Sequence, residues 1–157
     1  MKNKTNAMRR LDAAGIRYRV MEYAVDENDL SGTHIADEIG LPYEQVFKTL
    51  VAKGDKTGPV VFCIPCHREI DLKKAARVTG NKRIEMIHVK DLLGLTGYIR
   101  GGCSPIGMKK KFPTFIDDTA LLQTEITVSS GVRGAQLLLA VDALLPFIEA
   151  KCEELTE

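Results

Sequence analysis

The stretch KTLVAKGDKTGPVVFCIP, residues 48–65, consists of two apolar segments separated by the polar sequence DKTG. Val, Phe and Ile favour strands, and Asp and Gly between two such segments mark a turn, so the pattern predicts a β-hairpin. Other strand-like stretches are separated by helical patterns, without strict alternation of strand and helix. The hairpin and these helix-separated strands together predict a mixed sheet in a mixed α/β (α+β) protein.

Helical patterns lie on both sides of the hairpin. In residues 5–15 one face carries Ala7, Met8, Leu11 and Ala14, and Gly15 ends the pattern. Four more helices are expected, at residues 33–40 with Thr33 as N-cap and Gly40 at the end, 69–81 ending at Gly80, 88–97, and 142–155 with Asp142 as N-cap. Further strands are expected within residues 16–23, 113–122, 124–131 and 134–141.

The composition is that of an ordinary soluble globular protein, with 157 residues, 45% hydrophobic and 27% charged side chains and a net charge of +1. The N-terminal sequence lacks the apolar stretch of a signal peptide, and no segment approaches the ~20 apolar residues of a membrane span. We therefore expect a cytoplasmic protein that forms one compact domain over residues 1–157. A basic group at Arg100, Lys109, Lys110 and Lys111 either meets a phosphate-bearing ligand or is a solvated face.

The four cysteines are expected to be reduced, buried and structural. Cys63 to His67 spell CIPCH, which matches the C-x-x-C-H string of c-type haem attachment. The match lies in an apolar strand of a chain without an export signal, so we expect no haem. The remaining cysteines and histidines are too scattered to complete a zinc site, so no metal is expected.

Sequence signatures of common catalytic sites are missing: there is no G-x-S-x-G elbow, no H-E-x-x-H string and no Walker loop. Three stretches remain, namely Lys48 with Thr49, the loop GGCSP at residues 101–105, and Ser129 with Ser130. Lys48 is either an edge residue that reaches into solvent or a cation aimed into a cleft. The glycines either make a tight turn or bring backbone donors close to a ligand.

Taken together, QVFKTLV (45–51), TGYIRGGCSPIGMKK (96–110) and SSGVRGAQLLLAVDAL (129–144) resemble the YbaK family of aminoacyl-tRNA deacylases. The domain of that family is similar to the editing domain of bacterial prolyl-tRNA synthetases. The resemblance extends over nearly the whole chain and implies a curved mixed β-sheet flanked by helices. Lys48 followed by Thr49 resembles the branch of the family that acts on Cys-tRNA(Pro).

The resemblance implies hydrolysis of the ester bond that joins a wrongly attached cysteine to tRNA(Pro), and also of the ester bond of Cys-tRNA(Cys). It implies no metal, no cofactor and no covalent enzyme nucleophile. The thiol of the esterified cysteine would attack its own carbonyl group and release the tRNA. Lys48 matches the essential lysine of the family and is the expected catalytic residue. The matching substrate-binding positions are Tyr23, Thr49, Gly101, Gly102 and Ser129. The expected tRNA contacts are Arg100, Lys109, Lys110 and Arg133.

Two features depart from the family pattern: Gln136 stands where the family often carries Asp, and no aromatic side chain is present near Leu30 and Ser31. The family loop does not require a cysteine, so Cys103 is interpreted as a bystander. The alternatives are a non-catalytic tRNA-binding or synthetase-associated module, a deacylase for another small amino acid on tRNA(Pro), and a cell-envelope or regulatory role. The expected partners are the acceptor end of tRNA and prolyl-tRNA synthetase, with no membrane.

Overall fold

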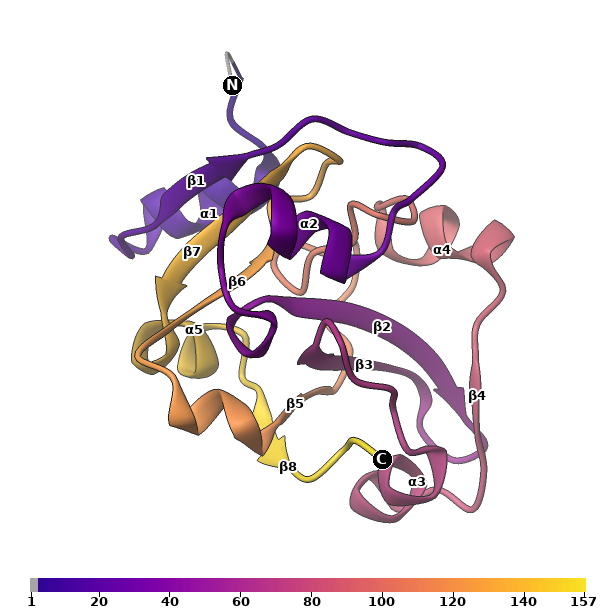
Figure 1. The fold of residues 1–157 in the computed structure, drawn as a ribbon. Coiled ribbons are helices and arrows are strands. Elements are labelled where there is room, and N and C mark those ends of the chain that lie inside the picture. The colour runs from indigo at the N-terminus through magenta and orange to yellow at the C-terminus, as the bar shows by residue number, and fades with distance from the viewer. Residues whose placement is uncertain (1–2) are drawn as a thin grey trace.

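The computed structural model describes residues 3–157, and in this part of the chain eight strands form two sheets (Figure 1). The strand order is β1-β7-β6 in the three-stranded sheet and β4-β2-β3-β5-β8 in the five-stranded sheet. The predicted mixed α/β class is confirmed; the predicted domain begins at residue 1, and residues 1 and 2 lie outside the described part. The strands are β1 (Arg19–Glu22), β2 (Phe47–Gly54), β3 (Gly58–Pro65), β4 (Ile84–Met86), β5 (Thr114–Asp117), β6 (Glu125–Ser129), β7 (Ala135–Ala140) and β8 (Lys151–Glu153).

The predicted hairpin forms the centre of the five-stranded sheet. β2 and β3 pair in antiparallel register, from Phe47 opposite Pro65 to Gly54 opposite Gly58. On its other side β3 pairs with β5 in parallel, which makes the sheet mixed. Residues 60–65 of β3 are all buried, as expected for a central strand that is covered on both faces.

All five predicted helices are present, although the one predicted over residues 69–81 and the last are shorter than predicted. The longest helices within residues 3–157 have eight residues, too few to cross a bilayer. Ala14 is exposed, because the first helix ends one residue before it. The helices are α1 (Asn6–Ala13), α2 (Gly32–Ile39), α3 (Leu72–Thr79), α4 (Val89–Thr96) and α5 (Val141–Phe147), with short 3₁₀ helices η1 (Tyr43–Gln45) and η2 (Asp118–Leu122).

The helix ends agree with the predictions at their C-termini more than at their N-termini. Gly40 and Gly80 end α2 and α3 as predicted. The predicted N-cap Thr33 is wrong: Ser31 caps α2, and its Oγ accepts a hydrogen bond from the N–H of His34 at 3.3 Å. The predicted cap Asp142 is wrong too, because it lies inside α5, whose N-cap residue forms no side-chain cap.

The prediction of one helix over residues 142–155 is wrong in its second half. α5 ends at Phe147, and Glu149 turns the chain with a φ of 53°. Residues 151–153 then form β8, parallel to β5. The free edge of β5 offers backbone donors and acceptors, and Pro146 weakens the helix at this point, so pairing in the sheet prevails over the helical pattern.

The two sheets meet where β2 begins. Val46, just before β2, forms a parallel bridge with Thr127 of β6, so the expected curved sheet is divided into two joined parts. The main hydrophobic core includes Phe47, Val128 and Leu137 from both sheets. α2 lies over the junction, where its Ala36 packs with Val46 (Figure 1). This junction positions the candidate site.

Candidate active site

A cavity of about 530 Å³ opens at the junction of the two sheets. Its walls come from the start of β2, the N-terminal turn of α2, the segment after β3, the loop that follows α4, α4 itself, and the facing ends of β6 and β7. The cavity therefore gathers all three stretches that carry the family resemblance. The predicted site residues that line it are Lys48, Thr49, Arg100, Gly101 and Ser129.

Lys48 brings a partly buried positive charge into this cavity. The hairpin register places Pro65 opposite Phe47, and the next residue, Cys66, donates its N–H to the carbonyl of Val46 at 2.8 Å, so the segment after β3 begins beside the start of β2. The Lys48 side chain is 27% exposed, and its Nζ lies 3.8 Å from Oε1 of Glu69, whose side chain is 79% exposed. An ion pair with such an exposed partner contributes little to stability and is readily displaced. Lys48 is thus the cation in a cleft, and not an edge residue in solvent.

Ser129 of β6 and Gln136 of β7 form a buried polar wall of the cavity. They are direct cross-strand partners, so their side chains lie next to each other on one face of the three-stranded sheet. Ser129 Oγ accepts a hydrogen bond from the N–H of Gly131 at 3.2 Å. Gln136 Oε1 accepts one from Oγ1 of Thr127 at 3.1 Å. The cavity thus combines one cation with two ordered, buried polar side chains.

The two glycines of the loop have different roles. Gly101 lines the cavity and has a φ of 84°, a conformation that glycine adopts without strain. Gly102 is not part of the lining: its N–H donates to the carbonyl of Ile99 at 3.0 Å, and a Cβ there would lie 3.0 Å from the carbonyl carbon of Val132. Gly102 therefore lets the loop pack against the β6–β7 connection, and its amide is already bonded within the loop.

Arg133 holds this loop in place. Its Nε donates to the carbonyl oxygen of Arg100 at 2.9 Å, and its Nη1 lies 3.9 Å from Oε1 of Glu27. The exposed side chain of Arg100 remains at the cavity. Tyr23 lies outside the lining, and its backbone N–H donates to the carbonyl of Gly134 at 2.9 Å. Of the predicted site residues, Tyr23, Gly102 and Arg133 therefore lie around the cavity and not in its wall.

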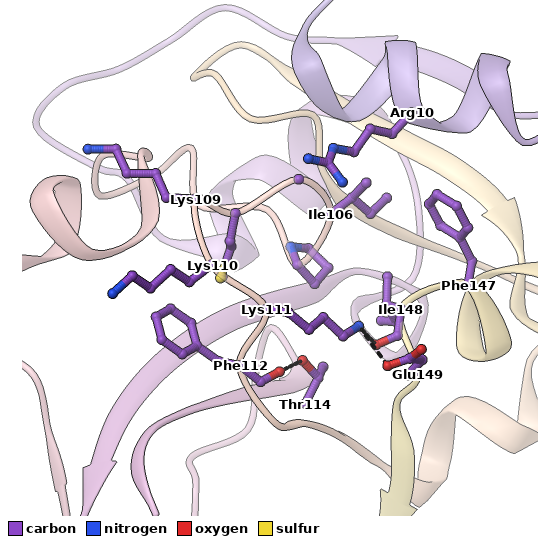
Figure 2. Close-up of a pocket in the computed structure, with 13 residues that line it drawn as sticks. Arg10, Ile106, Lys109, Lys110, Lys111, Phe112, Thr114, Phe147, Ile148 and Glu149 are labelled. Atoms are coloured by element: carbon purple, nitrogen blue, oxygen red, sulfur yellow. Dashed lines mark hydrogen bonds and ion pairs between the residues drawn. The ribbon is translucent and has the colours of Figure 1, made fainter.

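Lys109 and Lys110 lie elsewhere, in a second pocket of about 400 Å³ beside α1 (Figure 2). We call it the basic pocket, defined by Arg10, Lys109, Lys110 and Lys111. In Figure 2 the side chains of Lys109 and Lys110 extend away from Arg10. Lys111 turns instead toward Glu149, with its Nζ 3.5 Å from Oε2. Within the described chain the other three cations have no ion-pair partner.

Burial keeps the thiols at the cavity neutral. It raises the pKa of Cys66 to about 11 and that of Cys103 to about 12. A thiol with so high a pKa holds little thiolate near neutral pH, so neither cysteine is prepared as a nucleophile. Thr49 Oγ1 contacts the Sγ of Cys63 at 3.8 Å, and burial raises the pKa of that thiol to about 12.

Three lining residues that follow β3 were not found from the sequence: Cys66, His67 and Glu69. His67 Nε2 lies 3.9 Å from Oε1 of Glu44, and no hydrogen bond joins His67 to a serine or cysteine within residues 3–157. The described chain also holds no group of three or more side chains suited to a metal ion. The register of the hairpin was the signal that could have found these residues, because it brings the segment after Pro65 beside the start of β2.

Residues 31–147 match the model of the aminoacyl-tRNA editing domain, and the chain belongs to this family. The matched range includes Lys48, the glycine loop and Gln136. The chain is 49% identical over 153 residues to "Putative Cys-tRNA(Pro)/Cys-tRNA(Cys) deacylase EbsC" of Enterococcus faecalis, a match that covers 98% of this chain and 93% of that protein. The family predicted from the three stretches is thereby confirmed.

Two further relatives connect the chain with prolyl-tRNA synthetase. It is 32% identical over 92 residues to "Proline--tRNA ligase" of Streptomyces griseus, which covers 55% of this chain and 16% of the ligase. A crystal structure of "a putative trans-editing enzyme for prolyl tRNA synthetase" superposes with a TM-score of 0.85 at 25% identity, covering 99% of each chain. The similarity over both full lengths agrees with the fold described above.

Proposed function

We propose that this protein is a free-standing editing enzyme. It hydrolyses the ester bond that joins a wrongly attached cysteine to tRNA(Pro), and also the ester bond of Cys-tRNA(Cys). The main support is the cavity itself, which holds the partly buried cation of Lys48 and ordered polar groups but no prepared protein nucleophile. The name of the relative from Enterococcus faecalis gives both substrates. The related crystal structure carries the description of a trans-editing enzyme.

In this proposal the substrate supplies the nucleophile. The thiol of the esterified cysteine, as thiolate, attacks its own carbonyl carbon, so that a C–S bond forms and the C–O bond to the ribose breaks. The proton of the thiol ends on the ribose oxygen, and water later opens the cyclic thioester to give cysteine. Because the two reacting groups belong to one molecule, the protein needs only to hold the ester in a reactive conformation and to stabilise the charge that develops.

Lys48 supplies positive charge to the ester carbonyl or to the adjoining 3′-terminal phosphate. Its exposed partner Glu69 leaves when the negatively charged 3′ end enters, since the pair at 3.8 Å is weak. Arg100 adds positive potential at the same cavity. A cation in a partly buried position acts on a bound ester more strongly than the same cation in open water.

The basic pocket is proposed to contact the sugar-phosphate backbone of the tRNA. Arg10, Lys109 and Lys110 are exposed and free of ion pairs within the described chain, which suits contacts with phosphates. Such contacts carry no sequence information, so the choice of tRNA is proposed to come from prolyl-tRNA synthetase as a partner. The whole chain would then act as one editing domain in the cytoplasm, where its substrate is made.

A deacylation assay with a panel of aminoacyl-tRNAs tests this function. The panel contains Cys-tRNA(Pro), Cys-tRNA(Cys), Ser-tRNA(Pro), Ala-tRNA(Pro) and Pro-tRNA(Pro). We expect fast release of cysteine and little release of serine, because a thiol of pKa ~8.5 is partly ionised near neutral pH and a hydroxyl is not. Equal rates for cysteine and serine would show that the enzyme activates water instead. A folded protein that hydrolyses none of these esters would be a non-catalytic module.

A further inference from the structure

The side-chain amide of Gln136 is hydrogen-bonded to a buried residue of the neighbouring strand. Gln136 is 4% exposed and lines the cavity, and its Oε1 accepts a hydrogen bond from Oγ1 of Thr127 at 3.1 Å. Thr127 is fully buried, so its hydroxyl has no water with which to exchange this bond. The hydroxyl therefore holds the oxygen end of the amide and leaves the nitrogen end for the cavity.

That nitrogen end is an unused donor. Within residues 3–157 Gln136 Nε2 donates no hydrogen bond. No fully buried side-chain nitrogen or oxygen in the same residues lacks a partner, so Nε2 reaches the surface of the cavity. A side chain that is otherwise buried thus presents two N–H groups to whatever enters.

We propose that Gln136 is a substrate-binding residue whose Nε2 donates a hydrogen bond to the carbonyl oxygen of the aminoacyl ester; this rests on the proposed function. Oε1 already accepts a hydrogen bond from Thr127, whereas the N–H groups of Nε2 have no hydrogen-bond partner in the described chain, so the groups of this side chain without any partner are donors. The α-ammonium group of an aminoacyl ester is itself only a donor and cannot pair with these N–H groups. The ester carbonyl is an acceptor and can.

Ser129 completes a pair of donors. Its Oγ accepts from the N–H of Gly131, which leaves the hydroxyl hydrogen for the ligand, and it lies directly across from Gln136 in the sheet. As sulfur adds to the carbonyl carbon, negative charge moves to the carbonyl oxygen. Donors that are already in place stabilise this charge without reorganisation. Thr127 acts through Gln136 and is a positioning residue.

Two variants of Gln136 test the donor directly. Gln136→Leu removes both polar atoms, and Gln136→Glu keeps the shape and the bond from Thr127 but replaces the N–H donors with a carboxylate. We expect each to lower kcat for Cys-tRNA(Pro) by ~10²–10³-fold, the usual effect of losing one oxyanion donor, with a smaller change in KM. A loss confined to KM, or wild-type kinetics in folded Gln136→Glu, would overturn the proposal.

The pH dependence of Gln136→Glu separates a donor from a merely structural residue. When the introduced carboxyl group is protonated it again has an O–H to donate. The ratio of wild-type to variant kcat should therefore shrink as the pH is lowered from 8 toward 5. Gln136→Leu cannot recover in this way and is the matched control. A ratio that stays constant with pH for Gln136→Glu would contradict the role of a donor.

Variants of Thr127 test the positioning step. Thr127→Val keeps the shape but frees the amide to rotate, so its kcat should lie between those of the wild type and Gln136→Leu. Thr127→Ser restores a hydroxyl and should restore most of kcat. Equal losses for valine and serine at this position would point to packing alone and would remove the positioning role.

A binding measurement keeps the inference independent of turnover. The probe is 3′-(cysteinylamino)-3′-deoxyadenosine, in which a stable amide replaces the ester. In NMR spectra of ¹⁵N-labelled protein we expect this probe to shift the side-chain amide signal of Gln136, assigned by its absence in Gln136→Leu. If the wild type hydrolyses no ester but this signal shifts, the proposed function fails and the contact stands. If the probe shifts other cavity signals and not this one, the contact is wrong.

Discussion

The cavity at the junction of the sheets and the basic pocket beside α1 both present cations, yet they differ in what surrounds them. In the cavity, Lys48 is partly buried and lies with the ordered side chains of Ser129 and Gln136. In the basic pocket, Lys109 and Lys110 are exposed, and their side chains extend away from Arg10 (Figure 2). The cavity limits both the access of water to these side chains and their movement, whereas the basic pocket limits neither.

The cavity is therefore suited to the chemical step, and the basic pocket is suited to the affinity for tRNA. A charge held among buried, oriented donors stabilises a developing charge, because the groups need not reorganise and the local dielectric constant is low. Exposed cations are screened by salt and act on the phosphates of a nucleic acid with little geometric demand. We therefore expect variants of the two regions to change different kinetic quantities.

The largest effect is expected at Lys48. Lys48→Ala should lower the single-turnover rate on Cys-tRNA(Pro) by at least ~10²–10³-fold, the loss typical of one preorganised charge-stabilising group. Lys48→Arg should also be impaired, since a planar guanidinium does not replace a compact ammonium. The matched control is Lys53→Ala, an exposed lysine on the same strand, which should keep the wild-type rate. Folded Lys48→Ala that edits at the wild-type rate would show that the two regions do not differ in this way.

A smaller effect is expected in the basic pocket. The double variant Lys109→Ala/Lys110→Ala should weaken tRNA binding and lower the slope of log K against log salt by about 1 for each phosphate that the protein no longer neutralises. Its single-turnover rate at saturating protein should stay close to that of the wild type. Lys73→Ala, an exposed lysine on α3, serves as control. An unchanged salt slope would argue against binding of tRNA at this pocket. A large decrease of the single-turnover rate at saturating protein would show that the basic pocket also acts in the chemical step.

Because the buried thiols have raised pKa values, we expect the free energy of unfolding to decrease at alkaline pH. The folded-state pKa values of Cys63, Cys66 and Cys103 lie at about 11 to 12, above the ~8.5 of an unfolded cysteine. Below pH ~8.5 both states keep these protons, but above it the unfolded state loses them first, so the free energy of unfolding falls as the pH rises. Urea unfolding at pH 7.5, 9 and 10 measures this, and Cys63→Ser should show a shallower fall. Equal stability at pH 7.5 and 10 would contradict it.

The smallest effect is expected at the cysteine of the glycine loop. Cys103→Ser should keep the deacylation rate within a few-fold of the wild type, because the buried thiol is un-ionised near neutral pH and the substrate brings its own thiol. The same holds for Cys66→Ser. A loss of several orders of magnitude in either variant would identify a protein nucleophile.

Local patterns in the sequence were sufficient for most of the fold. The apolar segments around DKTG define β2 and β3, and the glycines at 40 and 80 end α2 and α3. β8 could not be found in this way, because its three residues have no strand pattern of their own. They form a strand only because β5 has a free edge, and that edge depends on residues distant in the sequence.

Only part of the site could be predicted from the sequence, because its other contacts also depend on residues that are distant in the sequence. Lys48, Gly101 and Ser129 stand in recognisable stretches, and the structure brings them to one cavity. The proximity of Glu69 to Lys48 depends on the exact pairing of the hairpin, and the free donor of Gln136 depends on a bond from a residue on another strand. Cross-strand relations of this kind become visible only once the register is known.

A crystal structure with the stable amide analogue 3′-(cysteinylamino)-3′-deoxyadenosine tests the central claim most directly, namely that the cavity at the junction of the sheets is the catalytic site. The cysteinyl group should lie in this cavity, with its carbonyl oxygen at a hydrogen-bond distance of ~2.7–3.1 Å from Nε2 of Gln136 and its linked sugar toward Lys48. A cysteinyl group bound in the basic pocket would contradict this claim, whereas one bound in the cavity with its ammonium group against Gln136 would contradict only the proposed contact with Nε2.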